Sequence, residues 1–159
     1  MPDMLVRLYD LPDALDLIRS LAKNGVNIRR SISPEKHIVV DFVKNRWGQR
    51  WANQVETAYS NTPVSCWMAV KENALLGFAV YDATCRNFFG PTGVEENARG
   101  NGIGKTLLLL TLHDMAAQGY AYAIIGGAGP TDFYTKTVKA ILIPDSSPGI
   151  YKGVLTSSQ

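Results

Sequence analysis

Residues 93–106 read GVEENARGNGIGKT, and they are the most informative part of the chain. The pattern predicts the end of a strand, a short polar loop and the start of a helix, with glycines at positions 100, 102 and 104. Such glycines let the backbone approach a ligand and leave the first N–H groups of the helix unobstructed. Together with the helix dipole, these groups favour a phosphate or pyrophosphate. The plainer alternative is a tight turn that lets the helix pack on the sheet.

Two cations, Arg99 and Lys105, add positive charge to the rim of this expected site. Nucleotide-binding patterns fit it only in part. A P-loop requires G-x-x-x-x-G-K-[ST], and its end is present at Gly104, Lys105 and Thr106, but Arg99 stands where its first glycine belongs. A dinucleotide fingerprint read from Gly100 requires a glycine where Lys105 stands. A nucleotide-phosphate binder stays a rival hypothesis.

The composition is that of an ordinary folded domain. The chain has 159 residues, of which 46% are hydrophobic and 19% charged, with a formal net charge of +2. This length and apolar content predict one domain over residues 1–159 with a sizeable core. The same apolar content excludes disorder for the chain as a whole. The near-neutral charge argues against a nucleic acid as partner, because nucleic-acid binders carry clustered basic residues.

The sequence also lacks signals of export or membrane insertion. Residues 1–10 contain charged residues and no apolar run of a secretory signal. No stretch reaches the ~18–20 apolar residues of a membrane span, so no membrane partner is expected. Cys66 and Cys85 lack C-x-x-C spacing and are interpreted as reduced core residues without a metal. These features favour a cytoplasmic protein.

Glycine, proline and asparagine divide the chain into short alternating elements, a pattern typical of one α/β domain. A helix is expected to begin after an N-cap at Asp10 and to end before Gly25. In the predicted strand at 86–94, Gly90 and Pro91 indicate a bulge where regular pairing fails. The other predicted elements are an edge strand at 4–9, a hairpin of strands at 64–71 and 75–82, helices at 33–47, 51–59, 102–118 and 132–136, and strands at 122–125, 140–143 and 150–155.

A further pattern covers residues 94–104. The spacing V-x-x-x-x-R-G-x-G-x-G, starting at Val94, resembles the [QR]-x-x-G-x-[GA] acyl-CoA motif of the GNAT superfamily of N-acetyltransferases. The resemblance implies that backbone amides after Arg99 hold the coenzyme A pyrophosphate and that the bulged strand binds the pantetheine arm. The cofactor-binding residues expected on this basis are Thr92, Gly93, Val94, Arg99, Gly100, Asn101, Gly102, Ile103, Gly104, Lys105 and Thr106.

A second similarity lies in the C-terminal half. Residues 133–136, FYTK, resemble the F-Y-x-K segment of that family, in which the tyrosine lies near the coenzyme sulfur and is often assigned as general acid. The resemblance therefore makes Tyr134 the expected catalytic residue, and ordinary packing on a short amphipathic helix is the alternative. The chain departs from the family at residues 138–140, where VKA replaces the usual L-G-F, and at 126–129, where GGAG replaces a common asparagine.

The order of the elements also resembles that family, although the first ~60 residues match in this order alone. The implied fold is α/β (α+β), with a mixed, largely antiparallel central sheet of about six to seven strands flanked by helices. The implied activity moves an acetyl group from acetyl-CoA to a primary amine of a small molecule or peptide, by direct attack in a ternary complex and without a metal. A catalytically degenerate acyl-CoA-binding or regulatory module is the alternative. A homodimer is compatible with the resemblance, but the oligomeric state stays open.

The sequence does not identify a general base. Asp82, Glu95 and Glu96 are the carboxylates nearest the expected site, although the two glutamates are interpreted as surface residues. A water relay needs no base side chain. The oxyanion of the tetrahedral intermediate is expected to meet backbone N–H near Val94.

The sequence does not identify the acceptor either. The tryptophans Trp47, Trp51 and Trp67, with Arg46 and Arg50, are candidates for an acceptor pocket, because the segment before the hairpin commonly shapes the substrate side in the family. Core packing of the tryptophans and a solvated face for the arginines are the alternative. The turn-rich connector at 144–149 is expected to border the acceptor site.

Overall fold

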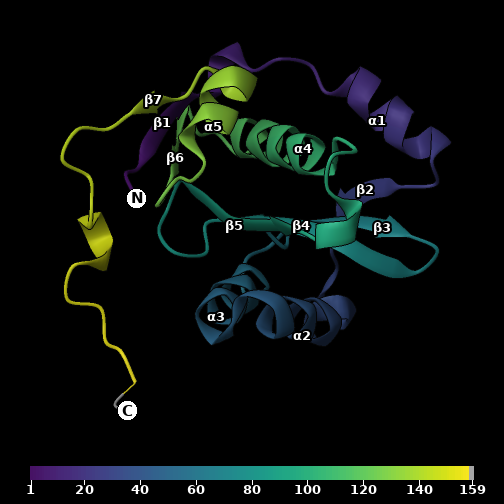
Figure 1. The fold of residues 1–159 in the computed structure, drawn as a ribbon, viewed down its shortest axis with the longest axis horizontal. Coiled ribbons are helices and arrows are strands. Elements are labelled where there is room, and N and C mark those ends of the chain that lie inside the picture. Colours follow the sequence, from purple (N-terminus) through teal and green to yellow (C-terminus); the bar gives the residue numbers. More distant parts are fainter. Residues whose placement is uncertain (158–159) are drawn as a thin grey trace.

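The computed structural model describes residues 1–157, which contain a seven-stranded sheet and five α-helices (Figure 1). The strand order is β2-β3-β4-β5-β6-β1-β7. Neighbouring strands are antiparallel except for the parallel pair β5 and β6, which confirms the predicted mixed, largely antiparallel sheet. The strands are β1 (Met4–Arg7), β2 (Asn27–Arg30), β3 (Cys66–Lys71), β4 (Ala74–Tyr81), β5 (Phe88–Val94), β6 (Tyr122–Ile125) and β7 (Ile141–Leu142). The helices are α1 (Leu15–Lys23), α2 (Lys36–Trp47), α3 (Gln49–Ala58), α4 (Ile103–Ala117) and α5 (Thr131–Val138).

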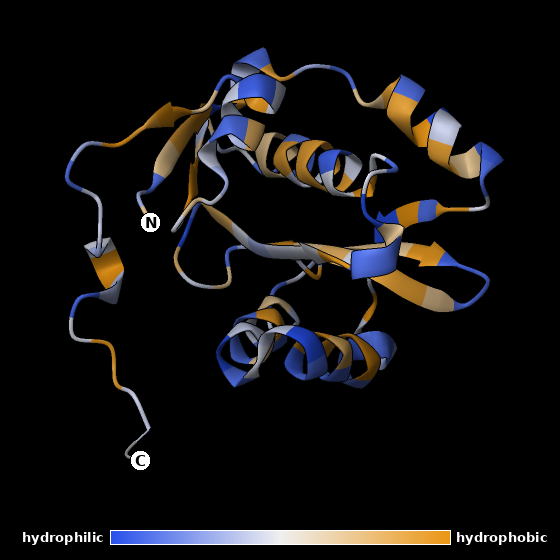
Figure 2. Ribbon diagram, in the orientation of Figure 1, coloured by the Kyte–Doolittle hydropathy of each residue, from blue (hydrophilic) through white to orange (hydrophobic). Residues whose placement is uncertain are grey.

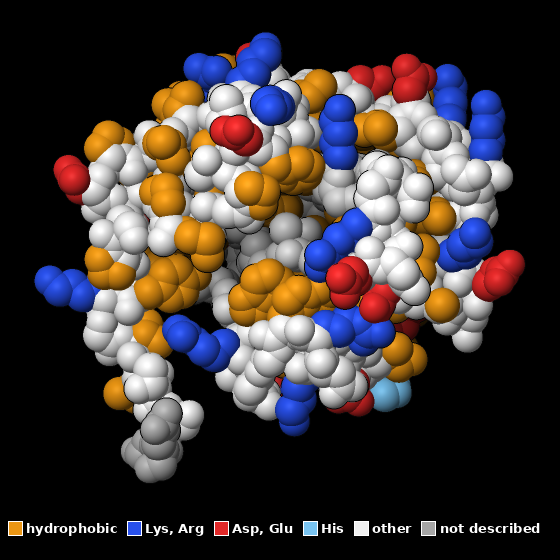
Figure 3. Space-filling view, in the orientation of Figure 1, with side chains coloured by type: hydrophobic (Ala, Val, Ile, Leu, Met, Phe, Trp, Pro, Cys, Tyr) orange, Lys and Arg blue, Asp and Glu red, His pale blue; other side chains and the backbone are white. Residues whose placement is uncertain are grey.

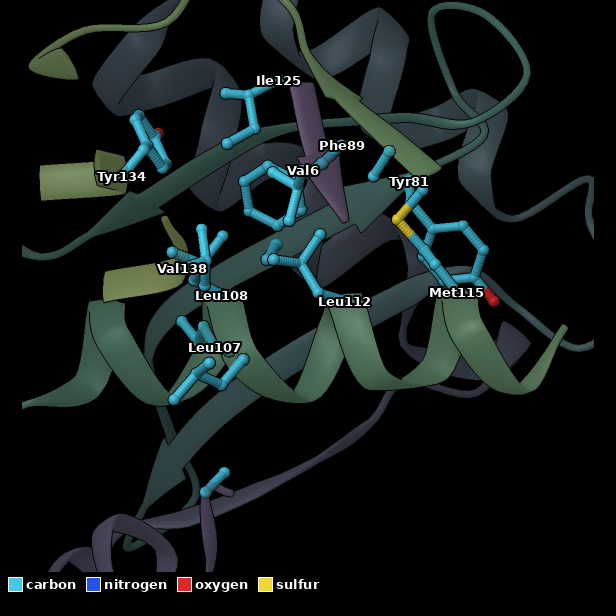
Figure 4. Packing of buried hydrophobic residues seen from close by; sticks show 14 of the residues in the cluster. Val6, Tyr81, Phe89, Leu107, Leu108, Leu112, Met115, Ile125, Tyr134 and Val138 are labelled. Atoms are coloured by element: carbon cyan, nitrogen blue, oxygen red, sulfur yellow. The ribbon is translucent and has the colours of Figure 1, made fainter. Parts of the chain in front are cut away.

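Helices cover both faces of the sheet. On one face lie α1, α4 and α5, and on the other lie α2 and α3 (Figure 1). The helix α4 is hydrophobic over most of its surface, whereas α2 and α3 also present hydrophilic residues to solvent (Figure 2). Leu107, Leu112 and Met115 of α4 belong to the larger core cluster, together with Phe89 of β5 (Figure 4). A helix that is apolar nearly all round is one that is buried between layers.

The smaller core cluster lies beneath α2 and α3. Val39 and Val43 of α2 and Val55 of α3 are buried there against Phe78 and Val80 of β4. Val39, Phe42 and Val43 of the apolar stripe predicted for the helix at 33–47 therefore face the sheet, whereas Ile38, the remaining residue of that stripe, is 55% exposed.

A buried polar cluster ties α4 to three strands. The carboxylate of Asp114 accepts hydrogen bonds from Arg30 Nη2 at 2.8 Å, Trp67 Nε1 at 3.0 Å and the Tyr81 hydroxyl at 2.8 Å. These partners lie on β2, β3 and β4. The cluster thus connects the helix with one half of the sheet.

Most predicted elements are confirmed to within a few residues. The hairpin of β3 and β4 turns at Glu72 and Asn73, which both have positive φ. The break between the second and third helices falls at Gly48, whose φ is 89°. Lys139, which replaces the glycine usual in the family, ends α5 at a φ of 54° and so adopts the left-handed conformation that the turn requires.

The fold departs from the sequence predictions at several further places. The strand predicted at the sheet edge, β1, lies between β6 and β7. The first α-helix begins at Leu15, where the Asp13 side chain accepts from the Leu15 N–H at 3.1 Å, and not after Asp10. The strand β2 was not predicted. Cys85 is exposed, whereas Cys66 is buried as expected.

The predicted strand at 150–155 is wrong. A 3₁₀ turn occupies Gly149–Tyr151, and Val154 and Leu155 are exposed, without a strand partner within residues 1–157. Positive φ at Gly149 and Gly153 interrupts the extended backbone that a strand needs. Among the described residues, no helix has the length and hydropathy needed to span a membrane.

Candidate active site

The sheet divides at β5. The first residues of this strand, Phe88 and Phe89, pair with Ile124 and Ile125 of β6. Beyond them β5 continues along β4 alone, because β6 ends at Ile125. The edge of residues 90–94 that faces away from β4 therefore has no strand partner within residues 1–157.

A bulge accompanies this division. Between the pairs Ala79–Thr92 and Tyr81–Phe89, β4 advances by two residues and β5 by three. The additional residue lies beside Gly90, whose φ of 115° is a conformation that residues with a Cβ rarely adopt. The bulge predicted at this position is confirmed.

Thr92 and Val94 supply the backbone groups of the free edge. Glu95 donates its N–H to the Leu76 carbonyl at 2.7 Å, so the backbone at residue 95 points to β4. Successive strand residues point their backbone groups to opposite sides, so those of Val94 and Thr92 point away from β4. Arg99 Nε donates to the Val94 carbonyl at 3.1 Å and leaves the Val94 N–H on the free edge.

The first turn of α4 lies beside this edge. A Cβ placed on Gly104 would be 3.5 Å from Cγ2 of Val94. Gly102 precedes the helix with φ of 85°, and no side chain caps it. The N–H groups of Ile103, Gly104 and Lys105 thus have no acceptor within the helix, and the helix dipole favours an anion in front of them.

The remaining motif residues differ in what they expose. Gly100 is exposed and has φ of 83°. Asn101 turns its side chain back and donates to the Ala98 carbonyl at 3.3 Å. Thr106 is buried, and its N–H and hydroxyl both donate to the Gly102 carbonyl, at 3.0 and 2.8 Å. The polar groups of Thr106 are therefore engaged inside the helix.

Charge and shape at the motif come from three further residues. Arg99 and Lys105 are exposed, and neither forms an ion pair within the described part of the chain. Gly93 lies under the indole of Trp47, because a Cβ there would be 2.6 Å from the ring carbon Cζ2. A side chain at residue 93 would displace that ring.

Tyr134 lies at the margin of the larger core cluster, on the side away from Met115 (Figure 4). It is 6% exposed, and its ring centroid is 5.1 Å from that of Phe133. Burial raises the pKa of the Tyr134 hydroxyl. The phenol therefore stays protonated across the physiological range, as a proton donor must.

A cavity of about 450 Å³ opens where the sheet divides, next to residues 88–91 of β5. Its walls also include Trp47 and Arg50 from the α2–α3 segment, Gly126 after β6, and Tyr151 near the C-terminus. The face of the molecule seen in Figure 3 is hollowed near its centre and bordered by hydrophobic side chains. Segments that are distant in the sequence thus build one concave site.

The candidate acceptor residues separate in the structure. Trp51 lines the cavity with Trp47, and both rings also pack on the core beneath α2 and α3. Trp67 lies elsewhere, where it donates to Asp114. Arg46 pairs with Glu95 and stacks over a core ring, so Arg50 is the arginine that lines the cavity.

The structure places no carboxylate in the wall of this cavity, among the residues that it describes. Asp82 accepts from the Tyr120 hydroxyl and the Asn87 N–H, each at 2.7 Å, beside a smaller cavity. Glu95 is paired with Arg46, and Glu96 is exposed.

The sequence model of the acetyltransferase (GNAT) family matches residues 32–134. The chain belongs to this family. No curated protein has a sequence that matches the chain significantly.

Solved structures share the fold. The GCN5-related glucosamine N-acetyltransferase region of a fungal multi-domain GH3 β-N-acetylglucosaminidase has a TM-score of 0.73 at 13% identity, over 89% of this chain and 19% of that chain. A GCN5-related N-acetyltransferase from Sphaerobacter thermophilus has a TM-score of 0.71 at 16% identity, over 89% and 48%. A GNAT family N-acetyltransferase from Escherichia coli, in complex with CoA, has a TM-score of 0.50 at 16% identity, over 60% and 59%. The chain thus spans less than half the length of the first two.

Proposed function

We propose that the chain is an acetyl-CoA-dependent N-acetyltransferase that moves an acetyl group to a primary amine by direct attack in a ternary complex. The observation that carries this proposal is the unpaired edge of β5 beside the uncapped first turn of α4. Membership in the GNAT family supports it, and so does the bound CoA of the Escherichia coli neighbour.

The two halves of this site fit two parts of acetyl-CoA, which supplies the acetyl group as a thioester. The free N–H groups from Gly100 to Lys105 hold the pyrophosphate, and Arg99 and Lys105 add charge at its rim. The backbone groups of Thr92 and Val94 that point away from β4 bind the pantetheine arm along the free edge, and Gly93 holds this segment against β4. Asn101, Ile103, Gly104 and Thr106 keep the loop and first turn in place.

The chemistry then needs few side chains. Holding amine and thioester in one site removes much of the entropic barrier. The Val94 N–H stabilises the oxyanion. Tyr134 protonates the departing thiolate. No carboxylate lines the cavity within residues 1–157, so the amine proton leaves through water.

The nucleotide hypothesis fits the site less well. A P-loop presents its Ser/Thr hydroxyl to a magnesium ion. The hydroxyl of Thr106 instead donates to the Gly102 carbonyl from a buried position. We therefore expect acetyl-CoA, and not ATP, to stabilise the protein.

Two measurements test the proposal. Thermal unfolding is measured without ligand, with acetyl-CoA and with ATP. We expect acetyl-CoA to raise Tm and ATP to leave it unchanged. A thiol-detecting assay with a panel of amines should show CoA release that depends on the amine. A larger shift with ATP would support the nucleotide hypothesis, and CoA binding without thiol release for any amine would support a degenerate module.

The role of Tyr134 is tested by Tyr134→Phe. We expect kcat to fall about 100-fold with KM for acetyl-CoA unchanged, because general acid catalysis is lost while the binding groups stay. Tyr122→Phe, at an exposed residue, is the matched control and should have no effect on turnover. Unchanged kcat across pH in Tyr134→Phe would exclude the acid role.

A further inference from the structure

The cavity beside the proposed acetyl site has a planar aromatic wall. Trp47 and Trp51 stack with ring centroids 5.8 Å apart and an interplanar angle of 17°. Phe78 meets both rings nearly edge-on, at centroid distances of 5.5 and 6.4 Å. The close fit of Trp47 over Gly93 holds the pair from the strand side. This pair of rings lines the cavity and offers an apolar aromatic surface to a ligand.

Another part of the cavity lining is also aromatic. The ring of Phe88 covers Gly126, where a Cβ would lie 2.9 Å from ring carbon Cδ2. The Tyr151 hydroxyl is 3.8 Å from the same position, and Tyr151 lines the cavity. Aromatic rings from the α2–α3 segment, from β5 and from the C-terminal segment therefore surround the cavity.

Arg50 is the one charged side chain that lines the cavity among the described residues. Thr84 donates to the side-chain oxygen of Gln54, and the Gln54 amide donates to the Arg50 carbonyl at 3.2 Å. The polar groups of these two side chains are therefore hydrogen-bonded to each other and to the backbone of α3. The Arg50 guanidinium forms no ion pair within residues 1–157. Arg46, one turn earlier, is neutralised by Glu95.

The charge pattern discriminates between amine acceptors. A polyamine or another polycation needs carboxylates for its extra ammonium groups, and no Asp or Glu lines the cavity among the described residues. A free guanidinium instead binds a carboxylate well, because its donors match the two oxygens. The cavity of about 450 Å³ lies near the small end of the ~300–1,000 Å³ range of small-molecule sites.

We infer that the acceptor is a free aromatic α-amino acid, an inference that rests on the proposed function. Its ring packs against the Trp47–Trp51 pair, its carboxylate pairs with Arg50, and its amine faces the free edge of β5. In the transfer, the amine nitrogen bonds to the acetyl carbon while the carbon–sulfur bond breaks. The nitrogen loses one proton to water and the thiolate gains one, which gives an N-acetyl amino acid and CoA.

The first test compares acceptors with and without each feature. The intact chain and acetyl-CoA are assayed for thiol release with L-tryptophan, L-phenylalanine, tryptamine, L-alanine, glucosamine and spermidine. We expect the two aromatic amino acids to have kcat/KM at least tenfold above the other four. Preference for spermidine or glucosamine would overturn the inference and leave the proposed transferase activity intact, and tryptamine equal to L-tryptophan would refute the role of the carboxylate.

The second test removes the charge. Arg50 is exposed, so Arg50→Gln is expected to fold normally. It should lower kcat/KM for L-tryptophan about 10–100-fold, the usual effect of losing a hydrogen-bonded charge pair, and leave tryptamine unchanged. Lys44→Gln, an exposed cation on α2, is the control. An equal loss for both acceptors would refute the pairing.

Calorimetric titration separates this inference from the proposed function. L-tryptophan is titrated into the protein with and without CoA. Binding of L-tryptophan without thiol release would support the ligand class and refute the transferase activity. Thiol release with other amines, and no binding of L-tryptophan, would support the transferase activity and refute the ligand class.

Discussion

Asp114 is a buried carboxylate on the mostly apolar helix α4. Burial alone would raise its pKa, but hydrogen bonds from Arg30, Trp67 and Tyr81 outweigh burial and hold the pKa below its ordinary value of 3.8. The side chain of Arg30 is itself only 27% exposed. Each group therefore depends on the other, because a buried charge without a partner is costly.

Asp114→Asn tests this dependence. We expect the free energy of unfolding to fall by about 3 kcal/mol at pH 7, since Arg30 loses its counter-charge. The folded pKa lies below the unfolded one, so the contribution of the carboxylate is complete above about pH 4 and is lost as the pH falls through the folded pKa. Urea unfolding at pH 7 and pH 3 measures it, with exposed Asp41→Asn as control. A deficit of the same size at both pH values would contradict the charge argument.

At the scale of the element, the start of α4 depends on one glycine more than on another. Gly102 has φ of 85°, where a side chain is strained, whereas Gly104 is the second residue of the helix. A Cβ on Gly104 would make an ordinary contact with Val94 at 3.5 Å. The backbone conformation therefore requires a glycine at residue 102 but not at residue 104.

The matched variants Gly102→Ala and Gly104→Ala test this difference. We expect Gly102→Ala to destabilise the chain by about 1 kcal/mol because of its positive φ, and Gly104→Ala to stabilise it by up to about 1 kcal/mol because alanine favours the helix. Urea unfolding gives both values. CoA titration should show weaker binding for Gly102→Ala, because strain there moves the free N–H groups. Equal effects of the two substitutions would be inconsistent with this reading.

Local sequence pattern, such as a long apolar run or two β-rich runs separated by a turn, was sufficient for some elements. The apolar helix α4 and the hairpin of β3 and β4 show their patterns within the element itself. The strand β2 was missed because Asn27, Arg29 and Arg30 give a polar edge strand without alternation. Residues 150–155 have strand-forming side chains, but the place beside β6 is filled by β1.

The two parts of the candidate site also differ in how far they could be predicted from the sequence. The glycine motif is contiguous, so its loop and helix start were predictable from spacing. The cavity is assembled from residues as distant as Arg50, Phe88 and Tyr151, which no local pattern connects. The separation of Trp67 from Trp47 and Trp51 likewise depends on which face of the sheet each residue occupies.

At the scale of the whole molecule, β1 and β7 bring distant segments into one sheet. Met4 pairs with both Ile125 of β6 and Leu142 of β7. Its side chain is 1% exposed and belongs to the larger core cluster. We propose on this basis that residues 1–159 fold as one cooperative domain.

Met4→Ala tests that cooperativity. We expect a loss of about 3 kcal/mol, the usual cost of a cavity at a fully buried methionine, in one unfolding transition followed alike by fluorescence and circular dichroism. Leu142→Ala is the matched control, because Leu142 is the cross-strand partner and 55% exposed. It should cost under about 1 kcal/mol. Two separate transitions in Met4→Ala would argue for independent units.

The position of β1 also constrains how the protein is made. Residues 4–7 are synthesised long before both of their partner strands, β6 and β7. Until then the apolar side chains of β1 have no native neighbours on the sheet. Such long-range pairing slows folding, because the chain must close a large loop before any contact is gained. The sheet can therefore close only after translation has passed residue 142, whatever has already formed around the hairpin.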